Sequence, residues 1–164
     1  MTTTNPADAA PESADNEYHE GGCVCGAVRY RTTGQPANVI VCHCAWCQRR
    51  TGSGFAVIPK FTRAQVELLS GDLNRYRSIS DESGRWLDLE FCPNCGTNIG
   101  FLQELRPDAH AIDAGTFDDP SWLAPDRQWF RYIFVRSSQA WSALPEGVEH
   151  HHGHFLEKEG PGKP

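Results

Sequence analysis

The sequence predicts a mainly β domain with little helix, and two observations support this fold class. Short runs of alternating or apolar residues, bounded by glycine and proline, follow one another from Gly21 onward, which is typical of strands joined by turns. All seven cysteines fall into three tight clusters, a pattern typical of metal sites that hold small sheets together. With 164 residues, the chain is long enough for one domain with its own core and too short for two.

The expected elements follow an N-terminal tail. Residues 1–18 are Ala, Pro, Thr, Asn and acidic side chains with hardly an apolar residue, so we expect a disordered acidic tail. The later runs have the usual length of strands. They lie at residues 28–32, 38–42, 54–59, 66–69, 73–79, 86–91, 98–102, 110–114 and 129–135. Alternation is clearest over 86–91, as in a half-buried strand. A short helix is expected at 137–144, capped by Ser137 or Ser138.

The distribution of charge excludes several kinds of partner. The formal net charge is −6, and five acidic residues within positions 1–20, with no lysine or arginine there, account for most of it. The body is nearly neutral and has no Lys/Arg tract, so we expect no binding to nucleic acid or to an anionic membrane. No stretch has the apolar length that spans a bilayer.

The spacing of the seven cysteines predicts two metal sites. The outer clusters together supply four thiolates, enough to close a tetrahedral zinc site. They are Cys23, Cys25, Cys92 and Cys95. The middle cluster supplies only three, namely Cys42, Cys44 and Cys47. A zinc held by three cysteines keeps one position open to a substrate, which separates a catalytic zinc from a structural one. We therefore expect two Zn²⁺ per chain.

Other uses of these cysteines fit less well. The odd count, the close pairs and the lack of an apolar signal segment disfavour extracellular disulfides, so we expect a cytoplasmic protein. A redox Cys-x-x-Cys pair normally opens a helix after a strand, whereas Pro93 and Gly96 predict a turn. The run Cys-x-Cys-x-x-Cys at 42–47 also departs from the plant-type iron–sulfur spacing.

The spacing inside each cluster gives a reason for the sulfurs to converge. Residues i and i+2 of a strand project to the same face, so the Cys-x-Cys pairs at 23–25 and 42–44 are each expected to point at one ion. In the Cys-Pro-Asn-Cys-Gly motif at 92–96, the proline fixes a turn and the glycine permits a left-handed backbone. A metal joining the outer clusters would close a long loop, and its removal is expected to unfold the domain.

Three motifs occur in order along the chain. They are Gly-Gly-Cys-Val-Cys-Gly-Ala-Val-Arg-Tyr at 21–30, Cys-His-Cys-Ala-Trp-Cys-Gln-Arg-Arg-Thr-Gly-Ser-Gly-Phe at 42–55 and Phe-Cys-Pro-Asn-Cys-Gly-Thr at 91–97. Together they resemble the glutathione-dependent formaldehyde-activating enzyme family, over roughly residues 19–145. The resemblance implies a centromere protein V-like, Mss4-like fold of several small antiparallel β-sheets stapled by zinc. It also implies the same division of the cysteines into structural and catalytic zinc ligands.

The resemblance implies a carbon–sulfur lyase that joins glutathione and formaldehyde into S-(hydroxymethyl)glutathione, a step of formaldehyde detoxification. The expected partners are therefore a small-molecule thiol and an aldehyde, with glutathione as co-substrate. A Lewis acid at the thiol sulfur or the aldehyde oxygen would promote formation of the carbon–sulfur bond.

Four residues after the middle cluster are candidates for contact with glutathione. Arg49 and Arg50 are expected to hold its carboxylates through forked hydrogen bonds, or else to balance the thiolates from a solvated turn. Thr51 and Ser53 lie among glycines that allow close backbone approach, so they are expected in the pocket wall, or else in a tight turn. Arg29 and Arg31 are also expected to offset thiolate charge.

The remaining candidates have simpler interpretations. His43 is expected to face away from the metal as a core or supporting group. Trp46 and Phe55 are expected in the core. The histidines between 150 and 154 are expected in an exposed tail over 149–164, which leaves 19–148 as the single zinc-binding domain.

Two other functions remain compatible with the sequence. One is a zinc-stabilised binding or scaffold module without turnover, which would need no open zinc position. The other is the same zinc chemistry acting on a different aldehyde or thiol, because substrate size is not readable from spacing.

Overall fold

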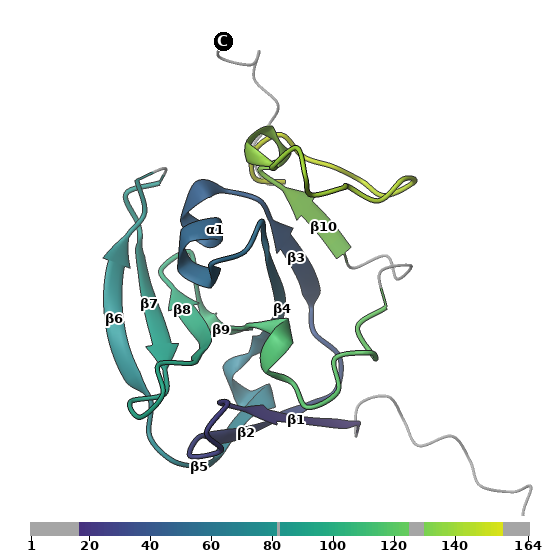
Figure 1. The fold of residues 1–164 in the computed structure, drawn as a ribbon. Coiled ribbons are helices and arrows are strands. Elements are labelled where there is room, and N and C mark those ends of the chain that lie inside the picture. Colours follow the sequence, from purple (N-terminus) through teal and green to yellow (C-terminus); the bar gives the residue numbers. More distant parts are fainter. Residues whose placement is uncertain (1–16, 82, 125–129, 156–164) are drawn as a thin grey trace, which may run out of the picture.

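The computed structural model describes residues 17–81, 83–124 and 130–155, and it confirms the mainly β fold (Figure 1). The smaller sheet contains, in spatial order, β1 (Tyr18–Gly22), β2 (Arg29–Thr33) and β5 (Val66–Ser70). The larger sheet contains, in spatial order, β10 (Phe130–Ile133), β3 (Asn38–Cys42), β4 (Ala56–Thr62), β9 (Arg106–Ile112), β8 (Asn98–Gln103), β7 (Trp86–Phe91) and β6 (Asn74–Ile79). The predicted strands at 38–42 and 86–91 have the observed bounds.

Antiparallel pairing dominates both sheets, with one parallel pair at an edge of the larger one. Strand β10 pairs with β3 in parallel, with Phe130 beside Val39. Parallel neighbours need a long connection, and here α1 and strands β4 to β9 lie between the two strands in sequence. In this respect the larger sheet differs from the small antiparallel sheets that the resemblance implied.

The helices differ from those predicted. The expected helix at 137–144 is wrong, because these residues form the end of a 3₁₀ turn, η4 (Val135–Ser137), followed by turns and irregular chain. The α-helix of the described chain is α1 (Ala45–Thr51), where no helix was expected. Cys44 caps it, since its sulfur accepts a hydrogen bond from the amide of Cys47. Gly52 ends it in the left-handed conformation with φ 64°. Two further 3₁₀ turns are η2 (Arg63–Gln65) and η3 (Ala114–Thr116).

Two buried clusters form the core, and each contains cysteines of one metal site. The first surrounds two of the outer-cluster cysteines and includes Tyr30, Phe61 and Ile112. The second contains Cys42 and Cys47 and lies where α1 packs on the larger sheet; its other buried members are Ile40, Ala56, Ile58, Phe101, Ala111 and Ile133. In Figure 1, α1 lies in the hollow of the larger sheet, between its β3–β10 side and its β6–β8 side. Each cysteine site is therefore built on its own part of the core.

The chain that was expected to be an exposed histidine tail packs against β10 as far as the structure describes it. The amide of His151 donates to the carbonyl of Tyr132 at 2.8 Å, and the amide of Phe134 donates to the carbonyl of Gly153 at 3.0 Å. His150 also packs its ring against Tyr132, with the ring centroids 5.5 Å apart. Residues 149–155 thus extend the edge of the larger sheet, whereas most of the predicted N-terminal tail, residues 1–16, lies outside the described residues.

No helix in the described parts of the chain is long and apolar enough to cross a membrane.

Candidate metal centres

The outer cysteine clusters meet in space, as the spacing predicted. All four Sγ atoms lie within 4.8 Å of one another, with Cys23 and Cys25 3.4 Å apart and Cys25 and Cys92 3.8 Å apart. These distances exceed the ~2.05 Å of a disulfide, and all seven cysteines are free. Cys23 and Cys25 lie in the turn after β1, so the expectation that one strand face aligns them is wrong. Two turns bring the sulfurs together: the turn before β2 carries Cys23 and Cys25, and the turn before β8 carries Cys92 and Cys95.

Hydrogen bonds to the sulfurs support negative charge at this four-cysteine site. The amide of Val28 donates to the sulfur of Cys23, and the side-chain amide of Asn94 donates to that of Cys25, each at 3.2 Å. The side chain and then the backbone of Thr97 lower the pKa of Cys95 to about 5. The four sulfurs could therefore hold a cation that closes the long loop between the two pairs.

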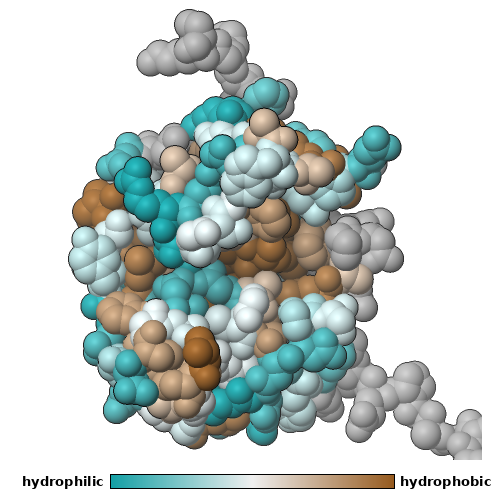
Figure 2. Space-filling view, viewed as in Figure 1, coloured by the Kyte–Doolittle hydropathy of each residue, from teal (hydrophilic) through white to brown (hydrophobic). Residues whose placement is uncertain are grey.

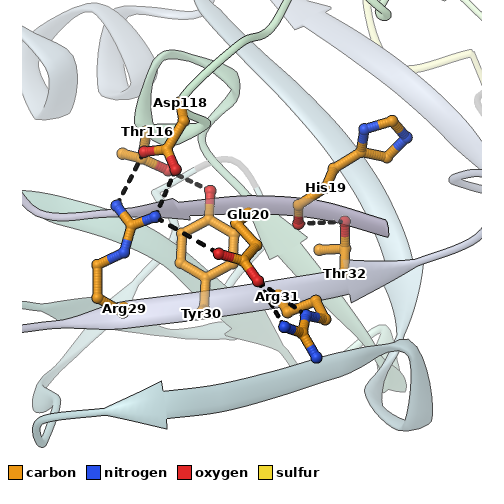
Figure 3. Close-up of polar contacts among 8 residues, drawn as sticks. All are labelled: His19, Glu20, Arg29, Tyr30, Arg31, Thr32, Thr116 and Asp118. Carbon is orange, nitrogen blue, oxygen red and sulfur yellow. Dashed lines mark hydrogen bonds and ion pairs between the residues drawn. The ribbon is translucent and has the colours of Figure 1, made fainter. Parts of the chain in front are cut away.

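A network of charged side chains fixes the smaller sheet next to this site (Figure 3). Arg29 forms a forked ion pair with Asp118, and Arg31 pairs with Glu20 at 2.6 Å. The hydroxyl of Tyr30 lies 2.8 Å from that of Thr116. Arg29 and Arg31 therefore form ion pairs with carboxylates, whereas the sequence suggested that they offset the charge of the thiolates.

The middle cluster forms a second group of sulfurs at the junction of β3 and α1. Cys42 ends β3, Cys44 caps α1 and Cys47 lies in the first turn of α1. Their three Sγ atoms also lie within 4.8 Å of one another, and those of Cys42 and Cys44 are 3.4 Å apart. Hydrogen bonds with Cys42 and Cys47, and then with backbone amides at the start of α1, lower the pKa of Cys44 in spite of its burial. This group could hold a cation with only three sulfur ligands.

A cavity of about 520 Å³ opens onto the three-cysteine site. All three cysteines line it, together with Trp46, which packs in the core beside them. Apolar side chains from β3, β4, β8, β10 and the residue after β10 form further parts of the wall. They are Ile40, Ile58, Phe101, Ile133 and Phe134. The charged or titratable residues of the wall are Lys60, Asp81, Arg85, Glu104 and His154. A small polar molecule could thus reach the three sulfurs through a partly apolar site.

The residues expected to hold glutathione line a different pocket. Arg50, Thr51 and Ser53 border a second cavity of about 770 Å³, with residues of η3 and with Phe130 of β10. Figure 2 shows a hollow with an apolar floor on this face, between the positions of α1, η3 and β10 in Figure 1. Arg49 is exposed and lines neither cavity.

Arg50 has a partner that the sequence did not reveal. Its guanidinium forms two hydrogen bonds with the carboxylate of Asp113, at 2.6 and 2.7 Å, and Asn98 donates to the same carboxylate. The Arg50 side chain is only 3% exposed. Burial opposes its charge, but the hydrogen bonds and charge of Asp113 raise the pKa of Arg50. Because the guanidinium of Arg50 already binds both carboxylate oxygens of Asp113, it is not free to bind a substrate carboxylate in this structure.

Sequence reasoning missed Lys60 and His154 as wall residues. The predicted strand at 54–59 stopped one residue before Lys60, although Ala56, Ile58 and Lys60 alternate along one face of β4. His154 was assigned to a tail, and only the packing of residues 149–155 beside β10 brings it to the cavity. His43 is buried as expected, and neither of its ring nitrogens has a hydrogen-bond partner in the described structure.

The fold and the two groups of sulfurs define a mainly β domain with one four-cysteine and one three-cysteine centre. The sequence model of the family described as glutathione-dependent formaldehyde-activating enzyme matches residues 18–133, which is well over half of the chain. The protein belongs to this family. Both cysteine groups lie inside the matched range, whereas Phe134 and His154 of the cavity wall lie beyond it.

Among solved structures, a crystal structure of a Rhodobacter sphaeroides protein is similar to this chain. The two chains have 21% sequence identity and a TM-score of 0.50. The match covers 64% of this chain and 94% of the other. This likeness supports the fold and nothing further. No curated protein matches the chain significantly.

Proposed function

We propose that the protein is a zinc-dependent carbon–sulfur lyase that joins glutathione and formaldehyde at the three-cysteine site. The observation that carries this proposal is the pairing of three convergent sulfurs with a cavity of about 520 Å³ that they line. Membership of the formaldehyde-activating family supports the choice of substrates. A scaffold would need only the four-cysteine site.

Both groups of sulfurs fit zinc by their chemistry and spacing. Four sulfurs at about 2.3 Å from a tetrahedral zinc lie about 3.8 Å from one another. The corresponding distances are 3.4 and 3.8 Å in the four-cysteine group and 3.4 Å in the three-cysteine group. Soft thiolates also favour zinc over hard cations. We therefore propose two Zn²⁺ per chain, of which the ion on Cys42, Cys44 and Cys47 would supply a Lewis acid with one open position.

The protein groups around the cavity have separate tasks in this proposal. The cap geometry of α1 orients the Cys44 sulfur, since the amide of Cys47 holds it at 3.3 Å. The apolar wall excludes water, which favours the adduct over hydrated formaldehyde. Arg85 lines this cavity and is proposed to contact a glutathione carboxylate, which is the role that the sequence predicted for Arg50. Arg49, an exposed residue of α1, also stays a candidate for contact with glutathione.

We also propose that this domain, which the packing of residues 149–155 extends beyond the predicted end at 148, works in a reducing compartment. Free thiols and metal thiolates persist where glutathione keeps cysteines reduced, so we place it in the cytoplasm.

The experiment that tests the function is exchange NMR on carbon-labelled formaldehyde with glutathione at equilibrium. Because the adduct also forms without a catalyst, only the exchange rate reports catalysis. The intact protein is expected to accelerate exchange, and Cys44→Ser is expected to match the sample without protein. No acceleration by a protein that carries both zinc ions would reject glutathione and formaldehyde as its substrates. Full acceleration by Cys44→Ser would reject the three-cysteine site.

A further inference from the structure

A partly buried lysine lines the three-cysteine cavity. Lys60 lies on β4, an interior strand of the larger sheet, and is one of three lysines in the chain. Lys60 projects from the same face of β4 as Ala56 and Ile58. These two residues belong to the same buried cluster as Cys42 and Cys47. Lys60 and all three cysteines line one cavity. Its side chain thus borders the same cavity as the three sulfurs.

The charge of Lys60 has no carboxylate partner. Among the described residues, no Asp or Glu oxygen lies within ion-pair distance of its Nζ, whose polar contact is Oε1 of Gln103 at 3.4 Å. Arg50 is the contrast, because Asp113 neutralises its buried charge. Burial lowers the pKa of Lys60 to about 8, while negative charge on Cys42 and Cys47 acts the other way. A cation that is partly withdrawn from water without a carboxylate partner costs folding free energy, so its position at the cavity suggests a functional role.

We propose that Lys60 is the proton donor to the aldehyde oxygen during carbon–sulfur bond formation, an inference that rests on the proposed function. The glutathione thiol first releases its proton to solvent. Its thiolate then adds to the carbonyl carbon, so that a carbon–sulfur bond forms and the π pair of the carbonyl moves to oxygen. The Lys60 ammonium hydrogen-bonds to this oxygen and gives it a proton, which yields the hydroxymethyl group. Solvent returns a proton to the amine, and the reverse reaction uses the amine as base.

The other polar wall residues are less suited to this task. Asp81 and Glu104 are acidic and would repel the developing oxyanion. Arg85 is a cation whose proton is not given up at neutral pH. His154 comes from the segment beside β10 and stacks on Phe155, with ring centroids 4.6 Å apart. Lys60 alone among these lies on an interior strand with the side chains that pack against Cys42 and Cys47.

Three variants test the lysine in the exchange experiment. Lys60→Met keeps the length of the side chain and removes the charge, Lys60→Arg keeps the charge and withholds the proton, and Lys158→Met is the matched control. Loss of a general acid lowers a rate by about 10²- to 10⁴-fold. We expect a loss of at least about 100-fold in both Lys60 variants, with unchanged zinc content and no change in Lys158→Met.

A binding measurement separates proton donation from a structural role. S-(carboxymethyl)glutathione places an anionic oxygen where the hydroxymethyl oxygen would lie, and S-ethylglutathione does not. By calorimetry, the intact protein and Lys60→Arg are expected to prefer the anionic analogue by about tenfold, as is reasonable for one charge-assisted hydrogen bond. Lys60→Met is expected to lose this preference while it still binds S-ethylglutathione as the intact protein does.

The outcomes keep the two proposals apart. If the intact protein accelerates exchange and Lys60→Met does so equally well, the role of Lys60 is overturned and the proposed function stands. Full activity of Lys60→Arg would overturn proton donation, since charge alone would then suffice. If the intact protein neither accelerates exchange nor binds either analogue, the proposed function fails and the role of Lys60 fails with it.

Discussion

The two cysteine centres are made from the same residue type and differ in how the chain builds them. The four-cysteine centre joins two turns that are distant in sequence, and two of its cysteines, Cys25 and Cys95, are exposed. The three-cysteine centre comes from one continuous segment at the start of α1 and faces a cavity. A metal that joins distant turns stabilises a fold, whereas a metal held within one segment contributes less to it. On the proposed function, this difference fits a structural role for the first centre and a catalytic role for the second.

The largest expected effect is the loss of the four-cysteine centre. Cys92→Ser removes a ligand that is fully buried between the two halves of the site. Binding of a structural zinc contributes about 10 kcal/mol or more of folding free energy, which equals the whole stability of a typical domain. We expect the variant to be unfolded by circular dichroism and to contain no stoichiometric zinc. A folded Cys92→Ser protein would show that this centre is not structural.

Next in size is the removal of the buried arginine of α1. Arg50→Met leaves the carboxylate of Asp113 without its cationic partner, which is expected to reduce the free energy of unfolding by about 3–5 kcal/mol. The matched control is the neighbouring exposed arginine, because Arg49→Met is expected to change it by less than about 0.5 kcal/mol. Denaturant titration of both variants makes this comparison. Equal losses would contradict the assignment of Arg50 to a buried ion pair.

A smaller effect is expected from acid at Glu90, on strand β7. Glu90 is buried, and although burial raises its pKa, hydrogen bonds and charges of His110 and then Arg75 lower it below the usual range. Its contribution to stability is therefore present above the unfolded pKa of about 4.3 and is lost as pH falls through the lower folded value. Glu90→Gln should reduce stability at pH 7 by about 1.5–3 kcal/mol.

That prediction is checked by urea unfolding of the intact protein and Glu90→Gln at pH 7, because strong acid would also displace zinc from thiolates. Equal stability of the two proteins at pH 7 would show that the ionised carboxylate is not what stabilises the strand pair.

The smallest effect on stability is expected at the three-cysteine centre. Cys44→Ser removes a metal ligand but leaves a good N-cap for α1, since serine is among the preferred capping residues. The free energy of unfolding should fall by about 1 kcal/mol or less, and the variant should keep one zinc per chain by elemental analysis. Unfolding of Cys44→Ser would remove the distinction between the two centres.

The sequence was sufficient for the parts of the sites that are local. Metal-ligand spacing constrains neighbouring residues directly, so the grouping of seven cysteines into four and three was predictable and the structure brings both groups together. The local structure that brings the sulfurs together was less predictable, because Cys44 caps a helix where the sequence predicted a strand. Cysteine is not a usual N-cap signal, and α1 has only seven residues.

Contacts between distant segments were beyond the sequence. Nothing in the sequence near Arg50 indicates that its guanidinium pairs with Asp113. The cavity wall also brings together Lys60 of β4 and His154 of the segment beside β10, which are far apart in sequence. Both depend on how the larger sheet pairs, including the parallel addition of β10 beside β3. The same limit applies to the predicted substrate contacts, because Arg50, Thr51 and Ser53 follow the middle cluster in sequence and border the other pocket in space.

The most direct test of the two-centre account is to follow zinc release and secondary structure together while a chromogenic chelator is added to the intact protein. One zinc per chain is expected to leave with an unchanged circular dichroism spectrum and with loss of formaldehyde–glutathione exchange. The second is expected to leave only as the spectrum becomes that of an unfolded chain. Simultaneous release of both ions with unfolding, or exchange activity that survives loss of the first ion, would contradict the division into a structural and a catalytic centre.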